Sequence, residues 1–184
     1  MQLTVRVTGV CVGQKGAGPG KQPLPAAIVT EYGFAGDRHA GPLWVRRTGP
    51  GKGTEVFNER QWSAVSEEEV RVLSQRLAID LPVGALGENL RLSGIPGLSK
   101  LPCGAMLRFG SGVVLGVSGE NLPCRRMASF LARRSGEEEV ERLFIKLATS
   151  LRGVVGWVEA PGILSEGDVA TIELPDLEVE RLIP

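Results

Sequence analysis

Short runs of alternating apolar and polar residues recur along the chain, which is the pattern of half-buried β-strands. The first run, at residues 3–12, reads L-T-V-R-V-T-G-V-C-V and is rich in β-branched residues. A loose alternation over residues 174–184 predicts an edge strand at the end of the chain. Further short runs predict strands at residues 26–30, 61–65, 91–92, 106–109, 113–117, 154–159 and 168–173.

Helical periodicity is confined to a few stretches. Ser66 and Glu69 form a capping box, and apolar residues at helical spacing follow, so residues 66–78 are predicted to form an amphipathic helix. Residues 137–148 have apolar positions at i, i+3, i+4 and i+7 and predict a second helix. Residues 127–134 predict a short third one, whereas residues 42–59, which include R-R-T-G-P-G-K-G-T, predict a loop.

About eight short strands and two or three helices follow one another without a βαβ rhythm. This order favours a mainly β (α+β) fold, a closed or nearly closed mixed β-barrel with peripheral helices, over a Rossmann-type sheet. The chain of 184 residues is long enough for one domain with a real core, and we expect a single domain over residues 1–184.

Composition excludes several classes of partner and compartment. The 21 basic and 21 acidic residues cancel, so no global field recruits nucleic acid or an anionic membrane surface. No apolar run has the length of a membrane span, and the first residues do not form a signal peptide. Three unevenly spaced cysteines make no disulfide framework. We therefore expect a cytoplasmic protein with free thiols.

The stretch at residues 118–127, S-G-E-N-L-P-C-R-R-M, contains the cysteine with the most reactive setting. Cys124 follows Pro123, which fixes the direction of the backbone, and precedes Arg125 and Arg126. Cysteines react and bind metals as thiolates, and neighbouring cations favour that form. These residues indicate a reactive or metal-ligating thiolate at the end of a strand. The alternative is a small buried hydrophobe that precedes two surface arginines.

The other two cysteines have less reactive settings. Cys11 lies within the first predicted strand, where a packed small side chain is the simpler interpretation. Cys103 also follows a proline, but its Pro-Cys-Gly context is typical of a turn and it has no basic neighbour until Arg108. We therefore favour Cys124 as the functional thiol.

A second informative stretch, G-F-A-G-D-R-H-A-G at residues 33–41, concentrates varied side chains on a flexible frame. Gly36 and its fellow glycines allow tight turns and close approach to a ligand. Backbone N–H groups together with Arg38 and His39, the only histidine, suit an anionic ligand. His39 is also a candidate proton donor near neutral pH. The alternative is a solvated turn with an internal pair between Asp37 and Arg38.

The tetrapeptide Gly-Glu-Asn-Leu occurs twice, at residues 87–90 and 119–122. The flanking residues differ, so the sequence does not support a duplication. Glu88, Asn89 and Asn121 are either turn residues, in which asparagine accepts an unusual backbone angle, or a carboxylate and two amides that position a ligand at the mouth of a strand.

In their order along the chain, these motifs resemble the MOSC domain family, named for the C-terminal domain of molybdenum cofactor sulfurases. Each match is short, but their succession over most of the chain makes the resemblance specific. It implies a stand-alone domain of the bacterial type, with a β-barrel like that of pyruvate kinase. The matching residues are 36–41 (G-D-R-H-A-G), 87–90 (G-E-N-L), Pro123-Cys124, Arg152-Gly153 and 162–168 (G-I-L-S-E-G-D).

The hallmark of this family is one cysteine in a Pro-Cys-like setting, which is Cys124 here. The resemblance implies two alternative roles for it. Cys124 either ligates molybdenum of a bound molybdopterin cofactor, as in relatives that reduce N-hydroxylated compounds, or carries sulfur as a persulfide to a metal–sulfur centre. In one respect the chain departs from the family: many relatives have an arginine shortly before the Pro-Cys pair, whereas Arg125 and Arg126 follow it.

The resemblance also implies partners. In larger members a pyridoxal-phosphate desulfurase domain precedes the barrel, and no such domain fits in 184 residues. We therefore expect pyridoxal phosphate only on a separate cysteine desulfurase. Three scattered cysteines also cannot supply the four ligands of an iron–sulfur domain, so a reductase of this type would need an electron-donor protein.

Our leading expectation is a molybdenum-dependent oxidoreductase or a sulfurtransferase that binds the cofactor or its sulfur. The alternatives are a non-catalytic persulfide carrier and a small-molecule-binding barrel with an incidental cysteine. In the leading case Cys124 and His39 are catalytic, and Cys124 is the molybdenum ligand. The residues expected to bind the cofactor or a small anionic ligand are Gly36, Asp37, Arg38, His39, Glu88, Asn89, Asn121, Arg125 and Arg126.

Overall fold

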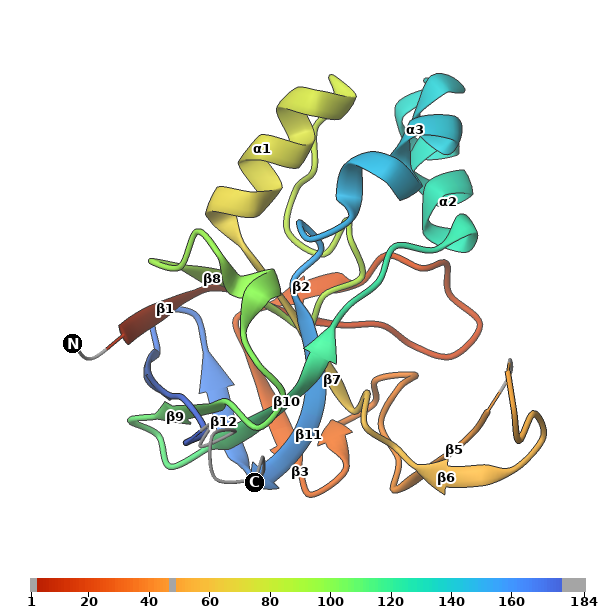
Figure 1. Ribbon diagram of the computed structural model, residues 1–184. Helices are drawn as coiled ribbons and strands as arrows, with labels where there is room; N and C mark the ends of the chain where they lie inside the picture. The colour runs from red at the N-terminus through yellow and green to blue at the C-terminus, as the bar shows by residue number, and fades with distance from the viewer. Residues whose placement is uncertain (1–2, 47–48, 177–184) are drawn as a thin grey trace, which may run out of the picture.

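A closed ring of seven β-strands forms the centre of the protein in the computed structural model (Figure 1). The structure describes residues 3–46 and 49–176. The ring runs β1, β13, β9, β10, β11, β7, β8 and back to β1, and β2 (Gln22–Leu24) extends it as an eighth strand beside β1. The ring strands are β1 (Leu3–Val12), β7 (Trp62–Ser66), β8 (Leu90–Ser93), β9 (Met106–Phe109), β10 (Val114–Glu120), β11 (Val154–Ala160) and β13 (Val169–Glu173).

The pairing within this ring is mixed. β7 and β8 run parallel, and the other neighbours run antiparallel. The parallel pair is possible because α1 (Glu67–Leu77) and the segment after it bring the chain back before β8 begins. The predicted closed mixed barrel of about eight strands is therefore confirmed.

The three α-helices of the described residues lie at one end of the barrel (Figure 1). α1 (Glu67–Leu77) begins at the predicted capping box, where the Ser66 side chain accepts a hydrogen bond from the Glu69 N–H. α2 (Arg125–Ser135) and α3 (Glu139–Ala148) pack against each other, and α1 packs on α3. In the described residues no helix is long and apolar enough to span a bilayer.

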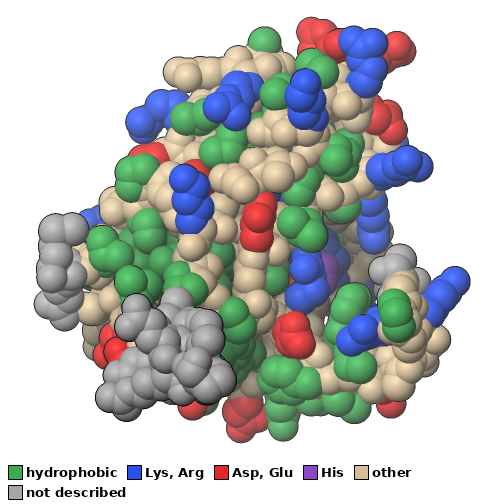
Figure 2. All heavy atoms as spheres, viewed as in Figure 1, with side chains coloured by type: hydrophobic (Ala, Val, Ile, Leu, Met, Phe, Trp, Pro, Cys, Tyr) green, Lys and Arg blue, Asp and Glu red, His purple; other side chains and the backbone are tan. Residues whose placement is uncertain are grey.

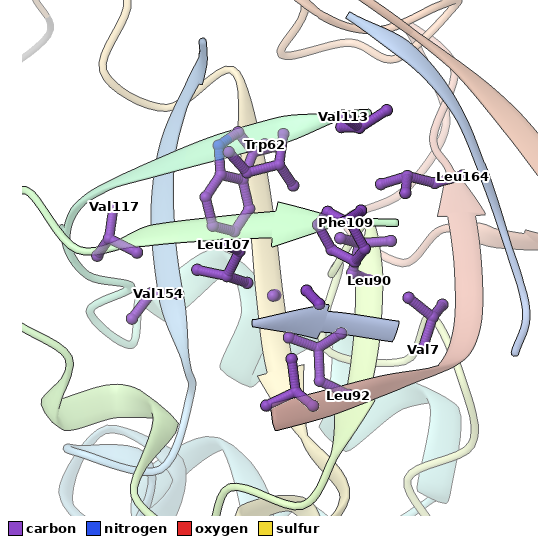
Figure 3. Close-up of a cluster of buried hydrophobic side chains, with 14 of the residues drawn as sticks. Val7, Trp62, Leu90, Leu92, Leu107, Phe109, Val113, Val117, Val154 and Leu164 are labelled. Carbon is purple, nitrogen blue, oxygen red and sulfur yellow. The ribbon is translucent and has the colours of Figure 1, made fainter. Parts of the chain in front are cut away.

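Inward-facing residues of the strands fill the barrel (Figure 3). In β1 the side chains of Val5 and Val7 are buried while those of Thr4 and Arg6 are not, as the alternation predicted. The largest fully buried side chain is Trp62, whose indole N–H donates to the Trp157 carbonyl at 2.7 Å. A second buried cluster lies between the three helices and the end of the barrel.

Several short strands were not predicted from the sequence. The segment predicted as a loop forms a hairpin of β5 (Leu43–Val45) and β6 (Glu55–Phe57). β4 (Gly33–Phe34) and β12 (Gly162–Ser165) were also not predicted, and both pair with the correctly predicted β3 (Ala26–Thr30). These are short, and glycine and proline around them hide their alternation. Of the predicted final edge strand, residues 174–176 are not a strand, and residues 177–184 lie outside the described residues.

Candidate functional site

Cys124 lies where the barrel meets the helices. β10 leads into an irregular segment, and Cys124 in extended conformation is the N-cap residue of α2. Its side chain makes no capping hydrogen bond, and the residue is exposed. Helix N-termini carry partial positive charge from unpaired N–H groups, and this is a setting in which proteins hold thiolates and other anions.

Two arginines from distant parts of the chain converge beside Cys124. Arg60, just before β7, donates from Nη2 to Asn121 Oδ1 at 3.0 Å, and Arg152, just before β11, donates from Nη1 to the same oxygen at 3.4 Å. Arg152 also donates to the carbonyls of Leu122 at 2.6 Å and Leu86 at 3.3 Å. One neutral amide oxygen thus receives hydrogen bonds from two cationic groups.

The charges of these guanidinium groups interact with Cys124. Burial lowers the pKa of Arg152, and the negative charge of a Cys124 thiolate is the largest effect that opposes this. The same two effects, in the same order, act on the pKa of Arg60. A guanidinium remains protonated throughout the physiological range even so. Arg60 and Arg152 therefore stay cationic, and a thiolate at Cys124 would interact with both.

A small cleft joins these residues to the glycine-rich segment. Its volume is about 60 Å³, and Figure 2 shows the single histidine recessed beside basic side chains above the β5–β6 hairpin. Of the residues predicted from sequence, His39 and Asn121 line this cleft. The full lining is His39, Arg60, Trp62, Ser63, Gly87, Asn121, Arg152 and Val155.

Backbone geometry brings the Arg152 segment to the cleft. Gly153 has φ +70°, and a Cβ there would lie 1.8 Å from the Ala64 carbonyl oxygen, so glycine alone fits. The Gly153 N–H donates to Ser99 Oγ at 2.7 Å, and the Gly153 carbonyl accepts from the Asn121 N–H at 2.9 Å. These contacts hold Asn121 next to Arg152.

A second set of hydrogen bonds connects the segments of Arg60 and His39. Asn58 Nδ2 donates to the carbonyls of His39 at 2.7 Å and Gly41 at 2.9 Å, and Asn58 Oδ1 accepts from the Arg60 N–H at 3.0 Å. Asn58 is almost completely buried. Asn58 therefore fixes the separation of the histidine and the arginine across the cleft.

Asp37 contacts both the backbone and the side chain of His39 and so orients it. Its Oδ1 accepts from the His39 N–H at 2.9 Å and lies 3.3 Å from His39 Nδ1. Its Oδ2 lies 2.8 Å from Lys21 Nζ and accepts from the Gly13 N–H at 2.9 Å. Both side chains of the Lys21–Asp37 pair are completely buried.

The ionisation of this buried pair follows from its contacts. Burial acts to raise the pKa of Asp37, but the hydrogen bond with His39 and the charge of Lys21 outweigh it and hold that pKa well below its usual range. Burial lowers the pKa of Lys21 to about 8, although Asp37 opposes the shift. Both groups are therefore charged at neutral pH and stabilise each other inside the protein.

Glu88 and Asn89 point into the protein. Asn89 accepts from Lys21 Nζ at 2.8 Å and donates to Asp37 Oδ2 at 3.1 Å, while Glu88 accepts from the N–H groups of Gly84 and Leu86 and pairs with Arg91 at 2.6 Å. Both side chains are fully buried. Their contacts brace the frame around the cleft, and neither lines it.

The remaining candidates for anion binding lie apart from the cleft lining. Arg38 Nη2 donates to the carbonyls of Pro19 and Gly20, and Gly36 has φ +78° in the turn before Asp37. Arg125 and Arg126, in the first turn of α2, are exposed. Their predicted role in binding stays a prediction.

The three thiols have different surroundings. Cys11 is buried, and burial raises its pKa to about 12. Cys103 is exposed and lines a separate hollow with Phe57, Glu59, Ser118 and Trp157. Within the described residues, no group of three or more histidine, cysteine or acidic side chains is arranged to hold a metal ion.

Sequence reasoning found the cysteine but missed the cations that surround it. Arg152 was visible only as part of the motif Arg152-Gly153, and Arg60 belongs to no motif. Strand pairing brings their segments together: β11 begins beside the end of β10 and pairs with β7 on its other side.

We expect His39 to titrate below pH 6.5. Its hydrogen bond with Asp37 acts to raise the pKa of His39, but burial and the charges of Lys21 and Arg38 outweigh it, so the pKa lies below the ordinary value of 6.5. The imidazole is then neutral at pH 7. Because the unfolded chain takes up this proton more readily, acidification from pH 6.5 to the native pKa lowers stability.

The chain has one histidine, so an NMR titration of its imidazole C–H signals reports His39 without assignment. A midpoint above 6.5 in the folded protein would contradict this prediction. Denatured protein in urea provides the reference midpoint for an imidazole that has lost its contacts.

Comparisons with known proteins point to one group of relatives. A family model described as "MOSC domain" matches residues 35–171. A protein of Bacillus subtilis (strain 168), named "Putative metal-sulfur cluster biosynthesis proteins YuaD", is 33% identical over 155 residues, which is 81% of this chain and 80% of that protein.

Solved structures agree with this comparison. The crystal structure of the YuaD protein from Bacillus subtilis superposes with a TM-score of 0.88 at 28% identity, over 96% of this chain and 99% of that one. The structure of YiiM from Geobacillus stearothermophilus has a TM-score of 0.65 at 17% identity, over 92% of this chain and 75% of that one. The second likeness concerns the fold alone.

Proposed function

The chain belongs to the MOSC domain family, and on that premise we propose that Cys124 carries sulfur as a persulfide and delivers it to a metal–sulfur centre of a partner protein. The observation that carries this proposal is the setting of the thiol: Cys124 is exposed at the N-terminus of α2, and Arg60 and Arg152 donate to Asn121 and Leu122 just before it.

This setting suits a sulfur carrier chemically. A persulfide is an anion at neutral pH, and two guanidinium groups with a helix N-terminus stabilise an anion at the end of the Cys124 side chain. Exposure lets a donor and an acceptor protein reach the same sulfur. The relative from Bacillus subtilis is named for metal-sulfur cluster biosynthesis, which supports a role in sulfur supply.

Binding of a molybdenum-pterin cofactor is the second candidate. The donor set fits such a group: a single accessible thiolate suits molybdenum, which prefers soft ligands, and Arg60 and Arg152 suit an anionic cofactor. When bound, the cofactor would supply oxygen-atom and electron transfer, as in the reduction of N-hydroxylated compounds. Cys124 would then hold the metal and His39 would hold or release a proton at the cleft.

Incubation with a cysteine desulfurase and cysteine tests the first candidate. We expect intact-protein mass spectrometry to show one added sulfur atom per chain, located by proteolysis on the peptide that contains Cys124 and removed by a thiol reductant. If Cys124 takes no sulfur from either a desulfurase or inorganic polysulfide, the carrier proposal is wrong.

A parallel analysis separates the two candidates. Protein purified from a host that makes the molybdenum cofactor is assayed for molybdenum and for oxidised pterin fluorescence. Stoichiometric cofactor that is lost in Cys124→Ala would favour the second candidate. Protein free of cofactor that still loads sulfur would favour the first.

A further inference from the structure

Arg60 and Arg152 form a concentration of positive charge that the described part of the chain does not neutralise. None of the six ion pairs found there includes either arginine. Glu88 lies near enough to Arg152 to affect its pKa, but its carboxylate already accepts from Arg91 and two backbone N–H groups. The charge of Glu59 likewise acts to raise the pKa of Arg60, but less than that of Cys124.

Leaving such charges without a partner costs free energy. Arg152 is only 7% exposed, and removing a cation from water is unfavourable unless an opposite charge or full hydrogen bonding compensates. Its Nε is buried and has no acceptor among the described residues. Asn121 Oδ1 is shared between the two arginines and is neutral. An external anion would satisfy both the charge and the free donor.

The size of the cleft limits this anion. The cleft is small, with a volume of about 60 Å³, and therefore suits a compact anion. A tetrahedral oxyanion has this size, and a guanidinium pairs with two of its oxygens at once.

The position of Cys124 indicates which class of substrate would carry the bound oxyanion. Arg60 donates to Asn121 and Arg152 to the carbonyl of Leu122, three and two residues before Cys124, so an oxyanion held by them lies close to the thiol. A thiolate attacks electrophilic sulfur, as in disulfide exchange. The substrate class that combines an oxyanion with such a sulfur is a thiosulfonate, of which thiosulfate is the simplest.

We propose that Arg60 and Arg152 form an oxyanion subsite that presents a thiosulfonate sulfur donor to Cys124. This inference rests on the proposed role of Cys124 as a sulfur carrier. The Cys124 thiolate attacks the terminal sulfur of thiosulfate, a Cys124 Sγ–S bond forms, and the S–S bond of thiosulfate breaks. The electron pair leaves with sulfite, so the products are the persulfide anion and sulfite, and no proton or external oxidant is required.

The test compares two sulfur donors on the reduced full-length chain. Thiosulfate carries the oxyanion and inorganic polysulfide does not. We expect both to add one sulfur atom to Cys124 by mass spectrometry, with one sulfite released per sulfur loaded from thiosulfate. Arg152→Gln should slow loading from thiosulfate by at least about tenfold, the effect of one lost charge-assisted hydrogen bond, and should slow loading from polysulfide by a smaller factor, because polysulfide carries no oxyanion for the subsite.

Two further variants control for charge and folding. Arg133→Gln removes an exposed arginine from the same helix as Cys124 and should leave both reactions unchanged. Arg60→Gln alters the less buried arginine and should reproduce the selective loss if Arg152→Gln fails to fold. In the wild type, sulfate should compete with thiosulfate but not with polysulfide, which tests the subsite without a substitution.

Each result distinguishes the subsite from the carrier role. Loading from polysulfide but not from thiosulfate would overturn the subsite and leave the carrier role intact. Loading from neither donor would overturn both. Equal loading from thiosulfate in the wild type and in both arginine variants would show that the arginines do not form the subsite.

Discussion

Cys124→Ser is expected to lose sulfur loading completely while the protein remains folded. A serine hydroxyl at this position is a far weaker nucleophile than a thiolate and forms no persulfide, so neither a desulfurase nor an inorganic donor can load it. Cys124 is exposed and its side chain caps nothing, so the free energy of unfolding should change by less than about 0.5 kcal/mol. Mass spectrometry and urea unfolding measure the two quantities.

Cys103→Ser is the matched control for this variant. Cys103 is also exposed and also follows a proline, but it lies in a separate hollow whose lining includes no arginine. We expect it to load sulfur like the wild type. Equal losses in the two variants would mean that Cys124 is not the specific carrier. Cys11 is buried and should not react in the folded protein.

Asp37→Ala is expected to lower the free energy of unfolding by about 3–5 kcal/mol, the usual cost of leaving one charge of a buried ion pair without its partner. The substitution leaves the buried Lys21 ammonium without its counter-charge and removes the acceptor for Gly13, His39 and Asn89. For a chain of this length such a loss lowers Tm by roughly 6–20 °C. Urea unfolding followed by circular dichroism measures it.

A double-mutant cycle separates the ion pair from the other contacts of Asp37. If the unpaired Lys21 charge causes most of the loss, Lys21→Met combined with Asp37→Ala should cost less than the two single changes added together. Glu31→Ala, an exposed acidic residue in the same segment, should change stability by less than about 0.5 kcal/mol. Strict additivity of Lys21→Met and Asp37→Ala would contradict the role given to the pair.

Asp37→Ala also affects the cleft through His39. Asp37 holds both the N–H and the Nδ1 of His39, so its loss frees the only histidine to turn away from Arg60 and Arg152. The effect on sulfur transfer must be measured well below the melting temperature of the variant. This precaution distinguishes a loss of positioning from a loss of folded protein.

Local sequence determined the elements whose side chains alternate or repeat strongly. The strand at residues 3–12, the capping box at Ser66 and the periodicity of residues 137–148 each depend on neighbours in the chain, and these were predicted correctly. The short strands of the β5–β6 hairpin and β12 carry too few residues for alternation to distinguish them from loops. Their pairing partners, which lie elsewhere in the chain, stabilise them.

For the candidate site, the sequence by itself identified Cys124 and the glycine-rich segment of His39, because both have distinctive neighbours. It assigned ligand binding to Asp37, Glu88 and Asn89, whose contacts in the structure are internal. Only the tertiary structure placed Arg60 and Arg152 beside Cys124. The physical reason is that charge acts through space: β11 begins beside the end of β10 and pairs with β7, and no local pattern records which distant cations this pairing brings to one cleft.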